Sequence, residues 1–122
     1  MRTIIAGCTL GLILSLSSQT WAGKDDHVLI QEAAQNIVTV SQVAQLSDET
    51  GVTLTGQITK HLHSDHYEFK DRSGIISLEI DDDLWHAAGL KVGDHVRVVG
   101  EVDTHRYKPT DIEVVKIEKN QH

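Results

Sequence analysis

From residue 52 onward, apolar and polar residues alternate along the chain, which is the pattern of strands with one buried face. The alternation covers residues 52–59 and returns over residues 66–70, where two aromatic residues share a face. An apolar run at residues 75–80 predicts a third strand, and residues 112–117 predict a fifth. The fourth strand lies between them and carries a row of valines on one face: Val96, Val98 and Val102.

Turn signals separate these strands. Residues 61–65 predict a turn between the first two strands, and the polar residues at 71–74 predict a hairpin turn after the second. Residues 105–110, which hold the only proline of the chain, predict a loop between the last two strands.

Two short stretches have helical rather than strand spacing. Residues 39–46 carry apolar side chains at every third position, which predicts a short amphipathic helix capped by Thr39 or Ser41. Three aspartates at 81–83 favour the start of a second short helix over residues 84–88, which the following glycine ends.

The order of these elements predicts an all-β fold with short helices. Three strands, a helix and two more strands are the order of a five-stranded OB-fold Greek-key barrel. Another five-stranded barrel or sandwich is the alternative, but a helix between strands three and four favours the OB-fold. We assign the domain to residues 39–119, preceded by a polar tether at 23–38 that is disordered or loosely helical, and followed by a tail at 120–122.

Residues 1–22 have the layout of a cleaved signal peptide. A basic residue precedes an apolar stretch, and small residues stand three before and one before a cut after Ala22. The apolar stretch is shorter than the about 20 residues that a membrane-spanning helix needs. Cys8 stands in a lipoprotein-like box, but most of the apolar core follows it, so we expect no lipid there. The sequence therefore predicts an exported, periplasmic protein without a membrane span.

The net charge and the cysteine content of the exported part exclude some partners and some chemistry. Cleavage removes one of the 11 basic residues and none of the 18 acidic ones, which leaves a formal charge of −8. Cleavage also removes the only cysteine, so no disulfide or thiol chemistry is expected. Affinity for nucleic acid comes largely from basic side chains that neutralise phosphates. Because the exported part is strongly acidic, we expect no nucleic-acid partner.

A combined pattern of short motifs extends over residues 39–119. It consists of the runs VTLTGQI (52–58), YEFKD (67–71), VGD (92–94), VVGEVD (98–103) and IEV (112–114), with Gly74, Ile80, Asp81 and Trp85. In this pattern the chain resembles the bacterial OB-fold (BOF) family of small periplasmic stress-tolerance proteins. The resemblance implies a periplasmic OB domain linked to envelope or oxidative stress, with no established catalytic activity and no settled ligand. The chain departs from the family at residues 24–36, which replace a glycine-rich segment, and in the histidine-rich turn between strands one and two.

An OB-fold usually binds its ligand over strands two and three, between the loops that join strands one to two and four to five. We expect these loops to bind an envelope component, a peptide or a small molecule. Alternatively, Tyr107 packs on the end of the barrel while its basic neighbours are solvated. The candidate ligand-binding residues are His61, His63, His66, His105, Arg106, Tyr107 and Lys108.

The string from His61 to His66 also has the HxHxDH pattern of metallo-β-lactamase-type hydrolases. Those enzymes need a much larger scaffold, so a hydrolase is only a remote alternative. A metal-binding protein that uses His61, His63 and His66 is a closer one, and zinc or copper would suit these ligands. Solvated histidines would explain the same string, and we expect no other cofactor. The aspartates at 81–83 lack the spacing of an EF-hand and are better explained as a helix start.

Overall fold

The computed structural model describes residues 25–120, and in it five strands close into a barrel in the order β1-β2-β3-β5-β4. The β3–β5 pair is parallel, and the other four neighbouring pairs are antiparallel. This arrangement, with a helix between β3 and β4, confirms the predicted OB-fold barrel. The strands are β1 (Gly51–His63), β2 (His66–Asp71), β3 (Gly74–Glu79), β4 (His95–Asp103) and β5 (Asp111–Lys119).

The core of the barrel consists of the apolar residues that the alternation placed on one face of each strand. Tyr67 and Phe69 point inward from β2, at 5% and 0% exposure. Val96, Val98 and Val102 of β4 are completely buried, as the spacing predicted. Other fully buried core residues are Val52, Leu54, Ile58, Leu78, Ile80 and Ile112.

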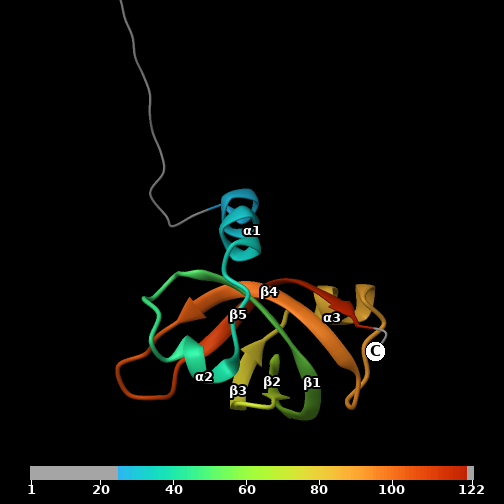
Figure 1. Cartoon of the computed structure of the whole chain (residues 1–122). Helices are drawn as coiled ribbons and strands as arrows, with labels where there is room; N and C mark the ends of the chain where they lie inside the picture. The colour runs from blue at the N-terminus through green and yellow to red at the C-terminus, as the bar shows by residue number, and fades with distance from the viewer. Residues whose placement is uncertain (1–24, 121–122) are drawn as a thin grey trace, which may run out of the picture.

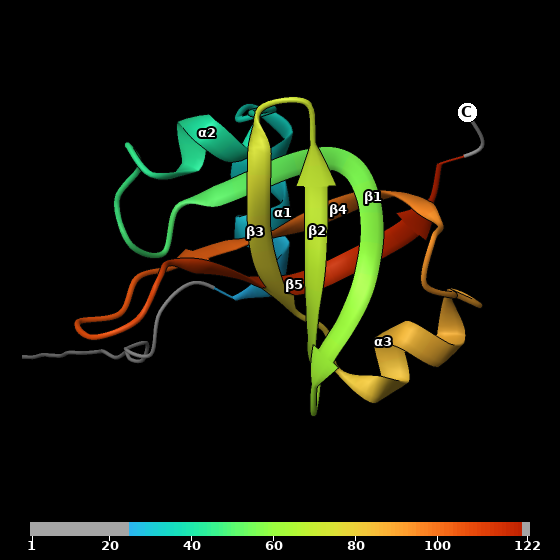
Figure 2. The ribbon, with the colours of Figure 1, turned by 90° about the horizontal axis from the view of Figure 1, so that it is seen from below.

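Strand β1 is long and lies beside both β2 and β4, as Figure 2 shows. Its first half pairs with β4 and its second half with β2, and Gln57 belongs to both ladders. The strand continues to His63, so the turn between β1 and β2 consists only of Ser64 and Asp65. The predicted turn at 61–65 is therefore too long, because cross-strand pairing continues through His61 and His63.

Helix α1 (Asp26–Ala34) lies on the barrel where a loose tether was expected. It rests on β1 and β4, as Figure 1 shows. Leu29 and Ala33, one turn apart, are buried at 2% and 0% exposure, and the Thr53 hydroxyl donates to the carbonyl oxygen of Ala33 at 2.8 Å. The segment has few apolar residues, but this spacing puts two of them on one helix face. This apolar face anchors α1 on the barrel.

Helix α2 (Val40–Val43) confirms the predicted amphipathic helix, although it is shorter. Thr39 caps it in a capping box with Gln42, and Val40 and Val43 are buried. The β2–β3 turn holds its start, because the backbone N–H of Val40 donates to Asp71 Oδ2 at 2.9 Å.

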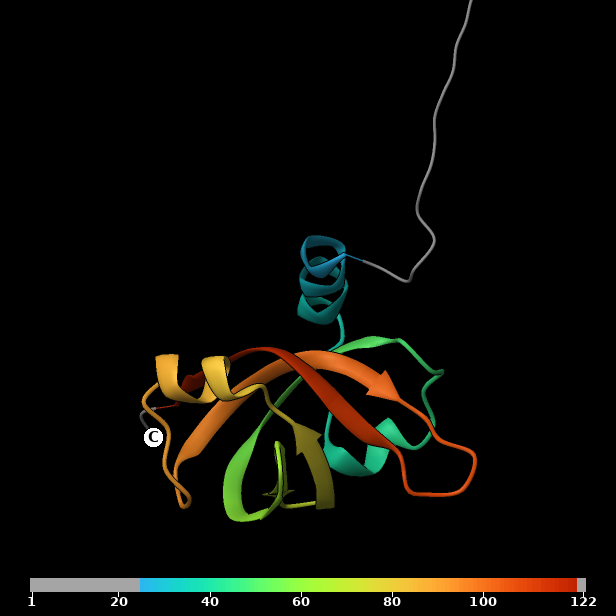
Figure 3. The same cartoon turned by 180° about the vertical axis from the view of Figure 1, so that it is seen from behind.

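Helix α3 (Asp82–Ala87) lies between β3 and β4 in the chain, as predicted, and Figure 3 shows it at one end of the barrel, away from the β4–β5 loop. Asp81 occupies the N-cap position, but its side chain makes no capping hydrogen bond. Gly89 follows the helix with φ of 65°, a left-handed conformation that glycine adopts easily. Within residues 25–120, no helix is long and apolar enough to cross a membrane.

Candidate functional site

A groove crosses β2 and β3 between the β1–β2 turn and the β4–β5 loop, which is where OB-folds bind their ligands. It encloses about 370 Å³, and we call it the β2–β3 groove. Its apolar lining includes Leu62 and Ile75, which are 42% and 57% exposed. Its polar lining includes His63, His66, Glu68, Lys108 and Asp111.

Strand register determines which side chains face this groove. The cross-strand pairs are His66 with Glu79, Glu68 with Ser77, and Lys70 with Ile75. Their neighbours on β2, the core residues Tyr67 and Phe69, face inward, so the paired residues face outward. The groove therefore presents exposed apolar side chains beside both acidic and basic ones.

The structure brings only some of the predicted ligand residues to the groove. His63, His66 and Lys108 line it. His61 does not, because its ring stacks on Tyr67 with centroids 4.6 Å apart and its Nε2 lies 2.6 Å from the carbonyl oxygen of Ser64. Tyr107 is 90% exposed at the tip of the β4–β5 loop, so it does not pack on the barrel end. Arg106, beside it, is also exposed.

The three histidines proposed as metal ligands do not form a shared site. His63 and His66 are neighbours, with ring centroids 5.0 Å apart, but His61 is held by Tyr67 and Ser64. Within residues 25–120, the groups of three candidate ligands within 4.8 Å of one another include only His66 from this set. The geometry of the HxHxDH string thus offers no support for the remote hydrolase alternative.

His66 instead belongs to a cluster of imidazoles and carboxylates at the base of the β4–β5 loop. His66 Nε2 lies 3.8 Å from Asp111 Oδ2, and His105 Nε2 lies 3.1 Å from Asp111 Oδ1. His105 Nε2 is also 3.6 Å from Asp103 Oδ2. We call His66, Glu79, Asp103, His105 and Asp111 the Asp111 cluster.

The cluster lies in a strongly acidic environment. Burial raises the pKa of the Glu79 carboxyl, and the charges of Asp65, Glu113 and Asp111 raise it further, while His66 opposes them. Asp111 itself is buried at 5% exposure. Glu79, Asp103 and Asp111 were not predicted as site residues. Strand pairing places Glu79 and Asp111 beside His66, and Asp103 pairs with Asp111 across β4 and β5.

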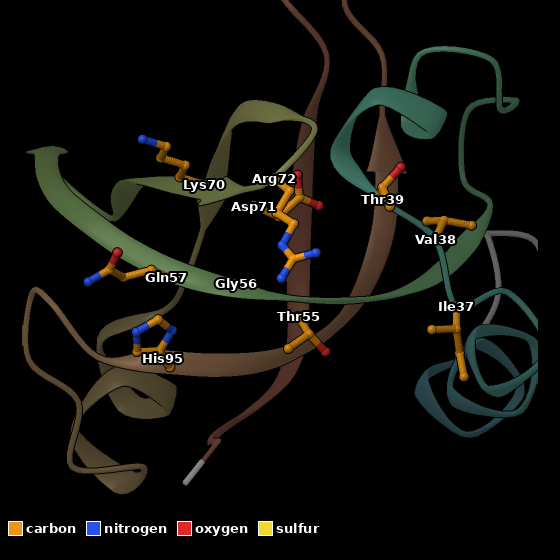
Figure 4. Close-up of a pocket in the computed structure, with 10 residues that line it drawn as sticks. All are labelled: Ile37, Val38, Thr39, Thr55, Gly56, Gln57, Lys70, Asp71, Arg72 and His95. Atoms are coloured by element: carbon orange, nitrogen blue, oxygen red, sulfur yellow. The ribbon is translucent and has the colours of Figure 1, made fainter. Parts of the chain in front are cut away.

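A second cavity, of about 570 Å³, lies where the segment before α2 meets β1, the β2–β3 turn and the start of β4. Figure 4 shows Arg72 extending from that turn toward β1, with His95 on the neighbouring strand β4. Gly56 lies among the lining residues of this cavity, and Ile37, which also lines it, is 68% exposed. This cavity is larger than the β2–β3 groove, but it contains none of the predicted ligand residues.

The family model for bacterial OB-fold (BOF) proteins matches residues 18–119. This chain belongs to the BOF family. A Haemophilus influenzae protein is 30% identical over 80% of both chains. The Escherichia coli protein YgiW is 37% identical over 69% of this chain and 64% of its own length. The calcium-regulated OB-fold protein CarO of Pseudomonas aeruginosa is 33% identical over 71% of this chain and 76% of its own.

A solved structure of a BOF relative agrees with the barrel described above. The structure of Escherichia coli YgiW matches 84% of this chain and all of its own, with a TM-score of 0.63 at 32% identity. The predicted resemblance to the BOF family is therefore confirmed by both sequence and structure.

Proposed function

We propose that this BOF protein is exported to the periplasm, where it acts without catalysis as a binding protein that supports tolerance of envelope or oxidative stress. Its ligand would be an envelope component, a peptide or a small molecule held in the β2–β3 groove. The chain belongs to the BOF family, and OB-folds commonly serve as binding modules, which favours this function over the hydrolase alternative.

The position and composition of the β2–β3 groove carry this proposal. The groove lies on the face that OB-folds use, and two loops frame it. Ile75 and Leu62 are exposed there at 57% and 42%, although a solvated strand face normally carries polar residues. Lys108 and Glu68 lie beside them, so the groove suits a ligand that has both an apolar part and charged or hydrogen-bonding groups.

The proposed location rests on the N-terminal sequence, which lies outside the described residues. The signal-peptide pattern over residues 1–22 predicts an exported chain that begins at Gly23. Mass spectrometry of the protein from a periplasmic fraction would measure this start directly. A lipid-modified chain beginning at Cys8 would contradict it.

Ligand binding can be tested by nuclear magnetic resonance on the labelled mature chain. The probe is the peptide and small-molecule fraction of a periplasmic extract, added to the wild type and to an Ile75→Asp variant. We expect amide shifts confined to β2, β3 and their flanking loops in the wild type, and a loss of these shifts in Ile75→Asp.

Val92→Asp is the matched control, because Val92 is 51% exposed and lies outside the groove. It should behave as the wild type does. Shifts that appear equally in all three proteins, or that lie around the second cavity, which Arg72 lines, would contradict the groove as the binding site.

For the stress role, the variant that loses binding should also fail to restore growth of a deletion strain under hydrogen peroxide.

A further inference from the structure

The buried carboxylate of Asp111 joins two imidazoles at the start of β5. One carboxylate oxygen, Oδ1, lies 3.1 Å from His105 Nε2, and the other, Oδ2, lies 3.8 Å from His66 Nε2. The Asp111 side chain is only 7% exposed, and those of His66 and His105 are 23% and 22% exposed. These groups are thus held at the edge of the β2–β3 groove with limited access to water.

The barrel itself fixes the positions of these residues. His66 on β2 pairs with Glu79 on β3, and Asp103 on β4 pairs with Asp111 on β5. The parallel β3–β5 ladder, in which Glu79 pairs with Glu113, brings the two halves together. Ligands supplied by paired strands are more rigid than ligands on a flexible loop.

The donor atoms are close enough to bind one ion after a small adjustment. One nitrogen of His66 and one oxygen each of Glu79 and Asp111 lie within 4.8 Å of one another. In a tetrahedral zinc site the ligand atoms lie about 2 Å from the metal and hence about 3.3 Å from each other. Rotation of the partly exposed His66 and Glu79 side chains would supply the remaining movement.

His66 also has a carboxylate beside its second ring nitrogen, where metal-bound histidines usually have an outer partner. Its Nδ1 is buried, has no hydrogen bond in the described part of the chain, and lies 3.3 Å from Asp65 Oδ1. A proton on Nδ1 directed at Asp65 would leave Nε2 free as a ligand. His105 would in the same way hold the second oxygen of Asp111.

We propose that His66 Nε2, Glu79 and Asp111 bind one zinc ion, with Asp65 and His105 orienting the ligands from outside. Imidazole nitrogen combined with carboxylate oxygen suits zinc better than calcium, which takes oxygen ligands alone. The site shares only His66 with the histidine triad suggested by the sequence. It rests on strand register and not on the proposed groove ligand.

The test is isothermal titration calorimetry of the tag-free mature chain with zinc chloride and, separately, calcium chloride at pH 7.5. We expect saturable binding of one zinc ion and much weaker binding of calcium. Glu79→Gln should weaken zinc binding at least about tenfold. Glu68→Gln is the matched control, because Glu68 lies in the same groove outside the Asp111 cluster, and it should bind zinc as the wild type does.

Two histidine variants separate this site from the histidine triad. His66→Gln should lose zinc binding, and His63→Gln should retain it. Equal losses in His63→Gln and Glu79→Gln, or no saturable zinc binding by the wild type, would overturn the proposal. Ile75→Asp should keep zinc binding while it loses the groove ligand, so failure of one proposal is distinguishable from failure of the other.

Since Asp111 is buried, Asp111→Asn could perturb folding, and a spectroscopic readout on the wild type avoids that problem. Nitrogen-15 spectra of the His66 ring should show a proton on Nδ1 and a zinc-induced shift at Nε2. Zinc-induced shifts on the His61 or His63 ring without any change at His66 would contradict the proposed ligands.

Discussion

The indole ring of Trp85 lies parallel to the phenol ring of Tyr67, with ring centroids 4.1 Å apart and planes 12° apart. His61 stacks on the same phenol at 4.6 Å, and rings this close and this parallel must occupy its opposite faces. Tyr67 thereby connects α3, β2 and the end of β1. Burial raises the pKa of its phenol, and the charges of Asp82 and Asp65 raise it further.

Removal of the Trp85 ring should therefore loosen α3 from the barrel. We expect Trp85→Ala to lower the free energy of unfolding by about 2 kcal/mol, because a half-buried aromatic surface and a stacked pair are lost together. His61→Ala removes the exposed partner and should cost less than about 1 kcal/mol. Urea denaturation followed by circular dichroism measures both, and equal losses would contradict the larger contribution expected of Trp85.

Gly56 is predicted to be intolerant of any side chain. A Cβ atom there would collide with the carbonyl oxygen of Lys70 and lie 2.7 Å from Phe69 Cζ, where β1 bends over β2. Gly56→Ala should therefore cost about 3 kcal/mol of stability. Gly74→Ala is the control, since its Cβ would meet Val40 Cγ1 at an ordinary 3.4 Å. Thermal melts of the two variants should differ clearly, and similar melting temperatures would show that β1 can shift.

The strands could be predicted from sequence because alternation is a local signal of which face is buried. Tyr67 and Phe69 follow it directly, and both are core residues. The extension of β1 to His63 could not be predicted, because it depends on pairing with β2 and its residues resemble a turn.

Of the residues in the Asp111 cluster, only the histidines His66 and His105 could be predicted from the sequence. His66 was identified from the histidine string, but Glu79 and Asp111 are separated from it by long stretches of sequence. Their proximity depends on the register of β2 with β3 and on the parallel β3–β5 pair. Neither of these leaves a signal in the local pattern.

Asp71 predicts a pH dependence of stability. Burial alone would raise the pKa of its carboxyl, but hydrogen bonds from the Ser73 hydroxyl and from the backbone of Val40, Ser73 and Gly74 outweigh burial and lower it. A pKa lowered by folding stabilises the protein above the unfolded value of 3.8, and this contribution disappears as pH falls through the folded value. We expect Asp71→Asn to cost about 1 kcal/mol at pH 7 and progressively less as the pH falls below 3.8. Urea unfolding over a series of pH values measures this, and a pH-independent loss would contradict the role of the charge.

Single-stranded DNA should not bind to this barrel at physiological salt, although many OB-folds bind it. Such binding needs a basic groove with aromatic side chains on which bases stack. Here Tyr67 and Phe69 are buried, and Trp85 is stacked on Tyr67, which leaves Tyr107 as the one highly exposed aromatic residue within residues 25–120.

The charge around the β2–β3 groove also opposes a phosphate backbone. Lys108 is outweighed by Glu68 and by the carboxylates of the Asp111 cluster, and the mature chain carries a formal charge of −8. Fluorescence anisotropy with labelled oligo(dT) should show no saturation at 150 mM salt and at most weak binding at 20 mM. Tyr107→Ala should change neither result, because one exposed ring beside a predominantly acidic groove cannot hold a strand. Micromolar binding that falls steeply with salt and depends on Tyr107 would instead show that the β4–β5 loop alone is sufficient to bind nucleic acid.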